Sequence, residues 1–133
     1  MTAPQATHSA YAYNRTRNAF IASELRRADT HWSRLRGLMG TSPNNFPHGS
    51  GLWIIPCQGV HTMWMRYAID VLYLDEDKRV VHVEENVRPW RMTPMHFDAA
   101  TVIEVRSPTV MSSGTCVGDT LEIVGFDDEL HHS

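Results

Sequence analysis

The sequence has few cysteines, no long apolar run and no extended basic run. Only Cys57 and Cys116 occur among its 133 residues, which excludes the disulfide framework that stabilises many small secreted domains. No apolar stretch approaches the roughly 20 residues that span a bilayer, and the N-terminal segment lacks the apolar centre of a signal peptide. We therefore expect a cytoplasmic protein that does not interact with a membrane.

Charge excludes a further class of function. The net charge is −3, which argues against a large nucleic-acid footprint, because such surfaces are strongly basic. The hydrophobic fraction of 42% and the charged fraction of 20% are those of an ordinary globular domain with a buried core. We expect one such domain over residues 18–126, with a flexible tail over 1–17 and a second tail over 127–133.

Short connections between short apolar segments indicate the fold class. We expect strands over 20–26, 52–55, 69–74, 79–87, 101–106 and 120–126. A helix is expected over 30–39, because apolar residues recur there at spacings of three and four. Short connections favour antiparallel pairing. The sequence thus predicts an α+β fold: a curled or barrel-like, mostly antiparallel sheet of about six short strands, with one covering helix.

The stretch between the second and third of these strands carries the densest set of reactive side chains. If 61–66 is extended, His61, Met63 and Met65 share one face, and a turn can bring Cys57 toward them. Thiol, imidazole and thioether groups are the donors that soft metals prefer. A Cys near a His is also the minimal pair for an activated thiolate. All four residues are equally suited to an ordinary core, in which Met fills irregular gaps.

Asp70 is unusual because it lies in a strand that is apolar on both faces. An unpaired buried carboxylate is costly, so Asp70 must be paired or hydrogen-bonded. We expect it to accept bonds from backbone amides of the turn 57–61. That structural role is favoured over a role as general base or ligand.

Residues 88–98 form an expected irregular loop with several candidate contact residues. Arg91 can stack on Trp90 or bind an anion, but a loop that is held in place by a buried Trp90 is favoured over both. Met92, Met95 and His96 make this loop the best candidate to cover the face that carries Cys57 and Met65. The acidic cluster over 75–78 is expected to be a solvated hairpin turn, because it lacks the spacing of a calcium loop.

Several short motifs together resemble the bacterial and archaeal family called domain of unknown function 192. They are Arg36–Gly40, Gly51–Ile54, Cys57 with His61, Thr62 and Met65, Ile69–Val71, Leu74–Asp75, Val80–Val81, Pro89–Arg91, Glu104–Val105 and Gly118–Asp119. The resemblance covers roughly residues 18–125. Ala68 stands where the family usually has Pro, and Ser107–Thr109 replaces a usual Ala-Gly-Thr run.

The resemblance implies a small α+β fold and no agreed reaction, cofactor or catalytic residue. Candidate residues therefore rest on physical grounds alone. We expect a small ligand or a metal ion as partner. The ligand-binding candidates are Cys57, His61, Asp70, Trp90 and Arg91, and the metal-ligand candidates are Cys57, His61, Met63 and Met65.

Three functions follow from these candidates. The first is a binding module with a soft-metal or small-ligand pocket around Cys57, His61 and Met65. The second is an interaction adaptor without chemistry, marked by an exposed apolar patch or by a dimer centred on Trp64 or Trp90. The third is an enzyme with Cys57 as nucleophile and His61 as base. We favour them in that order.

Overall fold

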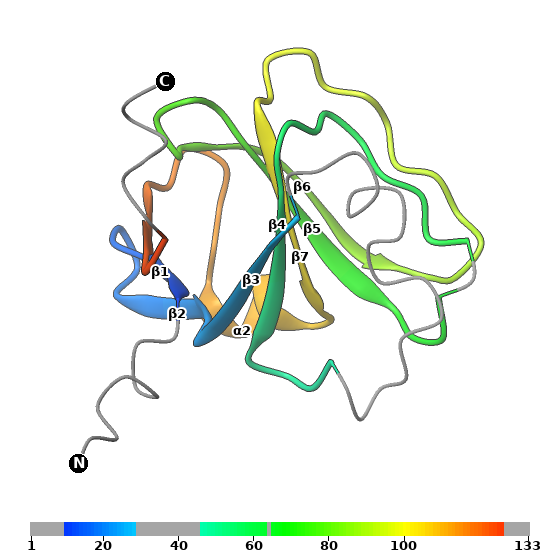
Figure 1. The fold of residues 1–133 in the computed structure, drawn as a ribbon, viewed down its shortest axis with the longest axis horizontal. Helices are drawn as coiled ribbons and strands as arrows, with labels where there is room; N and C mark the ends of the chain where they lie inside the picture. Colours follow the sequence, from blue (N-terminus) through cyan, green and yellow to red (C-terminus); the bar gives the residue numbers. More distant parts are fainter. Residues whose placement is uncertain (1–9, 29–45, 64, 127–133) are drawn as a thin grey trace.

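A computed structural model of the chain describes residues 10–28, 46–63 and 65–126. Eight strands and one short helix occur in these ranges, and the strands form two sheets (Figure 1). Strands β1 (Tyr11–Asn14), β2 (Ala19–Ala22) and β8 (Leu121–Val124) form a three-stranded antiparallel sheet in the order β2-β1-β8. The fold is therefore mostly β.

The larger sheet has five strands in the order β3-β4-β7-β5-β6. Its members are β3 (Glu24–Ala28), β4 (Ser50–Ile54), β5 (Ile69–Leu74), β6 (Val80–Val87) and β7 (Thr101–Arg106). All pairs are antiparallel except β3 with β4, which is parallel. Strands β3 and β6 are its edges, so the described strands do not close into the expected barrel.

Two apolar clusters cover the two faces of the five-stranded sheet. One lies between the sheets and includes Leu72 and Ile103 with Ala12 and Ile21 of the smaller sheet. The other includes Val71 and Tyr73 and is covered by loop residues such as Phe46. All six residues of β5 are buried, which confirms the expectation of a strand that is apolar on both faces.

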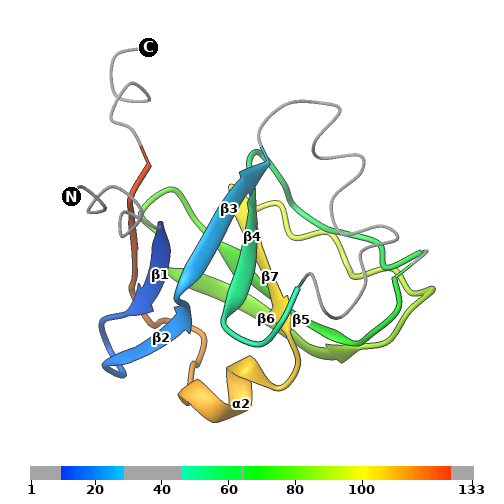
Figure 2. The same ribbon diagram turned by 60° about the horizontal axis from the view of Figure 1, so that its bottom comes forward.

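The strand count exceeds the expected six in the N-terminal part. Strand β1 lies inside the expected tail of residues 1–17, with Ala12 and Asn14 fully buried. Two strands, β2 and β3, replace the one expected over 20–26. Helix α2 (Thr109–Ser113) lies below the sheets in Figure 2, and the helix expected over 30–39 falls outside the described residues. No helix in the described ranges is long and apolar enough to cross a membrane.

Strand β6 departs from regular alternation at two places. Tyr73 pairs with His82 and Leu74 pairs with Val80, so Val81 has no partner on β5. This extra residue turns His82 toward the face of Tyr73, because a bulge shifts the alternation by one. Simple alternation in the sequence predicts that Val81, Val83 and Val87 share one face, but Val83 packs between the sheets and the other two pack on the opposite face.

Candidate functional site

Two long loops lie side by side at one end of the five-stranded sheet (Figure 1). Backbone bonds join Cys57 N to Ala100 O, His96 N to Gln58 O and Thr93 N to Val60 O. The Gln58 side chain adds bonds to the carbonyl oxygens of Phe97 and Ala99. The segments 57–62 and 91–100 are therefore fixed to each other along their length.

A cleft of about 760 Å³ opens beside this loop pair. Its apolar lining comes from Pro56, Met95, Phe97, Ala99 and Ala100, and its polar lining comes from Cys57, Gln58, Asp75, Glu76, Asp77 and Asp98. The acidic residues 75–77 belong to the hairpin turn between β5 and β6, where Asp75 Oδ1 accepts bonds from the backbone amides of Asp77 and Arg79. The expected hairpin turn thus forms one wall of the cleft.

The cleft is acidic. Four carboxylate side chains line it, and no Lys or Arg of the described residues does. The nearest cation along the chain, Lys78, extends its ammonium over the ring of Trp53, 5.6 Å from the centroid. Trp53 packs between the two sheets, on the opposite face of the larger sheet from Tyr73. Uncompensated carboxylates in a concave surface concentrate cations there.

The structure places the four predicted metal ligands in different environments. Cys57 is half-buried at the cleft, and its Sγ lies 3.2 Å from the carbonyl oxygen of Gly59. Residues 61–63 and 65–66 do not form a strand, so the alternation on which the prediction rested is absent. His61 forms an isolated bridge with Met92 and is exposed, and Met63 is exposed as well. Met65 is buried in the core.

Asp70 is fully buried and hydrogen-bonded to backbone amides, as its sequence context requires. Its partners differ from those expected. Oδ1 accepts a bond from Asn86 N and Oδ2 accepts one from Val110 N, both at 2.8 Å. The carboxylate therefore joins strand β6, at Asn86, to the start of α2, at Val110. It lies on the face between the two sheets, away from the cleft.

The loop that carries Trp90 and Arg91 is anchored by Thr62. The Thr62 hydroxyl donates to Arg88 O at 2.6 Å and accepts from Arg91 N at 2.8 Å. Trp90 is 53% exposed, so the expected anchoring by a buried indole is wrong. Its backbone has a φ of 66°, a conformation that is rare for a bulky residue. The Arg91 guanidinium lies 3.4 Å from the carbonyl oxygen of Trp90.

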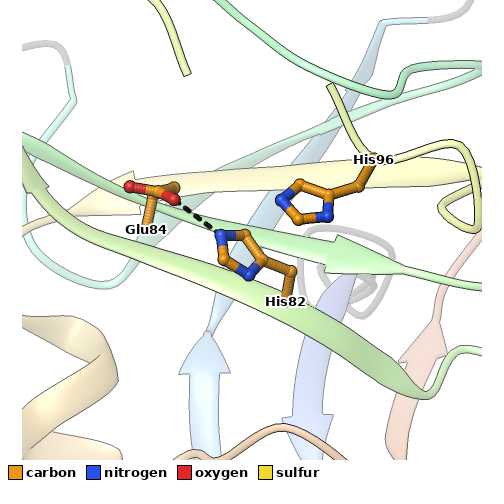
Figure 3. Close-up of side chains that lie close together, drawn as sticks. All are labelled: His82, Glu84 and His96. Atoms are coloured by element: carbon orange, nitrogen blue, oxygen red, sulfur yellow. Dashed lines mark hydrogen bonds and ion pairs between the residues drawn. The ribbon is translucent and has the colours of Figure 1, made fainter. Parts of the chain in front are cut away.

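One cluster of metal-binding side chains was not identified from the sequence. His82, Glu84 and His96 bring their ligand atoms within 4.8 Å of one another (Figure 3). The signal was present, since His82 and Glu84 are two residues apart in a strand and share a face. The bulge at Val81, which sets the direction of that face, has no signal in the sequence.

Tyr73 lies beneath the two imidazoles and fixes the loop above them. Its ring contacts those of His82 and His96 edge-on, with centroids 5.1 and 4.9 Å away. Its hydroxyl lies 2.6 Å from Thr93 Oγ1 and 2.7 Å from Pro94 O. Burial raises the pKa of Tyr73, although the bond with Thr93 opposes the shift, so the phenol stays neutral and donates a hydrogen bond.

Comparison with known proteins identifies related sequences. The model of the family domain of unknown function 192, described as "Uncharacterized ACR", matches residues 12–123. A UPF0127 protein of Pyrococcus furiosus is 31% identical over 114 residues, which are 82% of this chain and 94% of that protein. A UPF0127 protein of Thermococcus sibiricus is 28% identical over 114 residues, which are 82% of this chain and 71% of that protein.

Two crystal structures have the same fold. A protein of unknown function from Novosphingobium aromaticivorans superposes with a TM-score of 0.72 at 17% identity, covering 85% of this chain and 82% of its own. A Sinorhizobium meliloti protein named "putative transcription regulator" superposes with a TM-score of 0.74 at 19% identity, covering 88% and 93%. At these identities the likeness shows the fold alone.

Proposed function

This chain belongs to the uncharacterised family of domain of unknown function 192, and from that premise we propose that it is a small binding module whose ligand site is the cleft beside Cys57. The ligand that suits this cleft is a small molecule that joins a positively charged group to an apolar one. The observation that carries the proposal is a cleft in which the described residues contribute apolar side chains and four carboxylates but no basic side chain.

The dimensions of the cleft support a small ligand. Sites for small molecules are typically concavities of about 300–1,000 Å³ with mostly apolar walls and a few polar groups. The cleft falls in this range, at about 760 Å³. Met95 and Phe97 are largely exposed there, and burial of such side chains against a ligand removes apolar surface from water.

The charge of the cleft supports a cation over an anion. Asp75 and Asp77 come from the β5–β6 turn, and Asp98 comes from the loop opposite, so carboxylates stand on two sides. An amine or guanidinium placed between them gains charge-assisted hydrogen bonds. An anion of the same shape meets only like charge.

Cys57 provides a reporter for this site because its thiol lines the cleft. The experiment measures the rate at which a thiol reagent labels Cys57, in a Cys116→Ser background because Cys116 is exposed. Tryptamine is the cationic probe, and indole-3-acetate is an anionic probe of similar size. We expect tryptamine to slow the labelling in a saturable manner and indole-3-acetate to leave the rate unchanged.

Asp98→Asn tests the site, and Glu85→Gln is its matched control. Asp98 lines the cleft, whereas Glu85 is an exposed carboxylate on β6 outside it, so only the first substitution should weaken protection by tryptamine. Equal protection by both probes, or none by either, contradicts the proposal. The same data test the enzyme hypothesis, because an activated Cys57 must react faster than a free thiol.

A second candidate function, the interaction adaptor, is favoured by the surface of the loop pair. Eight large apolar side chains are exposed in the described residues, and five of them lie on these two loops: Met63, Trp90, Met92, Met95 and Phe97. Arg66, Arg88 and Arg91 are exposed on the same loops. Trp, Arg and Met are enriched in protein interfaces, and the arginines favour an acidic partner segment.

The adaptor function predicts self-association or complex formation through this surface. Sedimentation velocity of the wild type and of Trp90→Ala tests the self-association branch. A dimer that dissociates in the variant supports it, and a monomer at all concentrations in both proteins excludes it.

A further inference from the structure

The side chains of His82, Glu84 and His96 lie close together (Figure 3). The residues on either side of His96, Met95 and Phe97, line the cleft. We propose that the side chains of His82, Glu84 and His96 bind a divalent transition-metal ion, for which zinc is the best fit. The inference rests on these residues alone and stands independently of the ligand assigned to the cleft.

Each of the three side chains is positioned by the fold. The bulge at Val81 sets His82 opposite Tyr73, and Glu84 lies opposite Val71, so both side chains project from the same face of β6. His96 is held by its backbone, since its amide donates to Gln58 O and its carbonyl accepts from Ala99 N. Strand and loop thus bring the three side chains together.

The contacts within the cluster leave one ring nitrogen, Nε2 of His96, without a hydrogen-bond partner in the described part of the chain. His82 Nε2 and Glu84 Oε2 are 2.6 Å apart. His96 Nε2 is buried. A buried polar atom without a partner is unfavourable, and coordination of a metal ion removes that cost. This orphaned nitrogen is the observation that distinguishes a metal site from a hydrogen-bonded group of surface residues.

The composition of the cluster matches a metal site. The rings of His82 and His96 stack with centroids 3.8 Å apart, and Glu84 supplies one carboxylate beside them. Two neutral imidazoles and one carboxylate are a common ligand set for a divalent ion, in which the metal supplies the positive charge.

The donor set and its spacing favour zinc with an open coordination position. Zinc accepts imidazole nitrogen and carboxylate oxygen at about 2.0–2.2 Å in a tetrahedral arrangement, which places neighbouring donors about 3.4 Å apart. The ligand atoms lie within 4.8 Å of one another, so small movements suffice for binding. His82 Nε2 and Glu84 Oε2, now 2.6 Å apart, must separate to bind the same ion. The lone pair of each imidazole lies in its ring plane, and the two planes differ by only 26°. Binding must therefore rotate one ring out of the stack.

Water has access to the fourth position. The side chains of His82 and Glu84 are 29% and 32% exposed, so the cluster is neither sealed in the core nor fully solvated. Three protein ligands with one position left for water or a ligand is the arrangement of reactive zinc sites rather than of purely structural ones.

The test is zinc binding by the full-length chain after loading and desalting, measured by elemental analysis and by competition with a chromophoric chelator. His131 and His132 are replaced by Ala in every protein, because paired terminal histidines bind metal nonspecifically. We expect about one zinc per chain. Glu84→Gln and His96→Gln should each weaken zinc binding at least about tenfold, while their circular dichroism spectra stay those of the parent.

Two matched variants keep the proposal falsifiable. Glu85→Gln removes the exposed carboxylate next to Glu84 and should leave zinc affinity unchanged. Cys57→Ser should also retain zinc. Loss of zinc in Cys57→Ser with retention in His96→Gln overturns the proposal and assigns the metal to the thiol. Absence of bound zinc in the parent, or equal binding in Glu84→Gln and His96→Gln, overturns it as well.

A spectroscopic readout follows from the rotation of the rings. In the zinc-free protein, the stacked imidazoles shift each other's ring-proton NMR signals through their ring currents. Zinc should remove this mutual shift and bring both sets of ring protons to new positions at one equivalent. Unchanged signals of His82 and His96 at saturating zinc contradict the assignment.

Discussion

The imidazole of His82 stacks on that of His96 with 3.8 Å between centroids, although one residue belongs to an edge strand and the other to a loop. The contact depends on Val81, which has no partner on β5. Regular alternation from Val80 would turn His82 toward the three-stranded sheet. One inserted residue in β6 therefore brings the two imidazoles together.

Removal of the Tyr73 hydroxyl should loosen the loop that holds His96. Tyr73→Phe leaves Thr93 Oγ1 and Pro94 O without their buried partner, and we expect a loss of about 1–2 kcal/mol in the free energy of unfolding. Hydrogen exchange should accelerate at the amides of Thr93 and His96. Tyr13→Phe in the smaller sheet is the control. Unchanged exchange in Tyr73→Phe would show that the loop is held by its backbone bonds alone.

Asp70→Asn should destabilise the protein by roughly 2 kcal/mol. Both carboxylate oxygens of Asp70 accept hydrogen bonds from backbone amides. In Asn, an NH₂ group replaces one of these oxygens and cannot accept a hydrogen bond, so one of the two amides loses its partner. Urea unfolding measures the loss, and exchange at Asn86 and Val110 locates it. Asp98→Asn, at an exposed residue, should have little effect on stability. An equally small effect at Asp70 would contradict the structural role.

Glu104 predicts an unusual dependence of stability on pH. Its side chain lies on the face of Leu52 and Val71, and only 4% of the residue is exposed. Burial raises the pKa of Glu104 to about 8. In the unfolded chain it ionises near its ordinary value of 4.5, so the stability present below that pH is lost as the pH rises through 8.

The size of this loss is on the order of 4 kcal/mol, from the difference between the two pKa values. Urea unfolding at pH 5 and pH 8 should show the decrease in the wild type and a much smaller decrease in Glu104→Gln. Glu85→Gln should behave as the wild type does. A decrease of equal size in Glu104→Gln would show that another group is responsible.

Asp119 should contribute stability that is lost in acid. Burial alone would raise its pKa, but hydrogen bonds from Arg17, Asn14 and the Cys116 amide lower it overall. The contribution is therefore present above the ordinary pKa of 3.8 and is lost as the pH falls through the lowered value. Asp119→Ala should cost on the order of 3 kcal/mol at pH 7, because the buried Asn14 amide loses one of its two acceptors and Arg17 loses its ion pair.

The measurement for Asp119 is urea unfolding of the wild type and the variant at pH 7 and at pH 3. The difference between the two proteins should shrink at pH 3, and Glu76→Ala, at an exposed residue of the β5–β6 turn, should show no such change. A difference that is independent of pH would mean that packing, rather than charge, is lost.

Four of the five strands of the larger sheet, all except β3, could be predicted closely, because their signals are local. Residues 69–74 are apolar on both sides, and the structure buries all six in β5. Strand β1 lies in a segment that the sequence predicts to be a tail, because its residues have no apolar pattern. Asn14 is buried there through bonds to Thr115 and Asp119, which lie far away in the sequence. A strand that is stabilised by distant partners has no signature of its own.

By itself, the sequence determined the family, the central buried strand and the need of Asp70 for hydrogen-bond partners. Only the tertiary structure decided which partners Asp70 has, because Asn86 comes from the paired strand β6 and Val110 from the helix that follows β7. It also decided that His61, Met63 and Met65 do not share a face, whereas His82, Glu84 and His96 converge. The physical reason is that the side-chain period of a strand is two, so one turn or one bulged residue reverses every face that follows it.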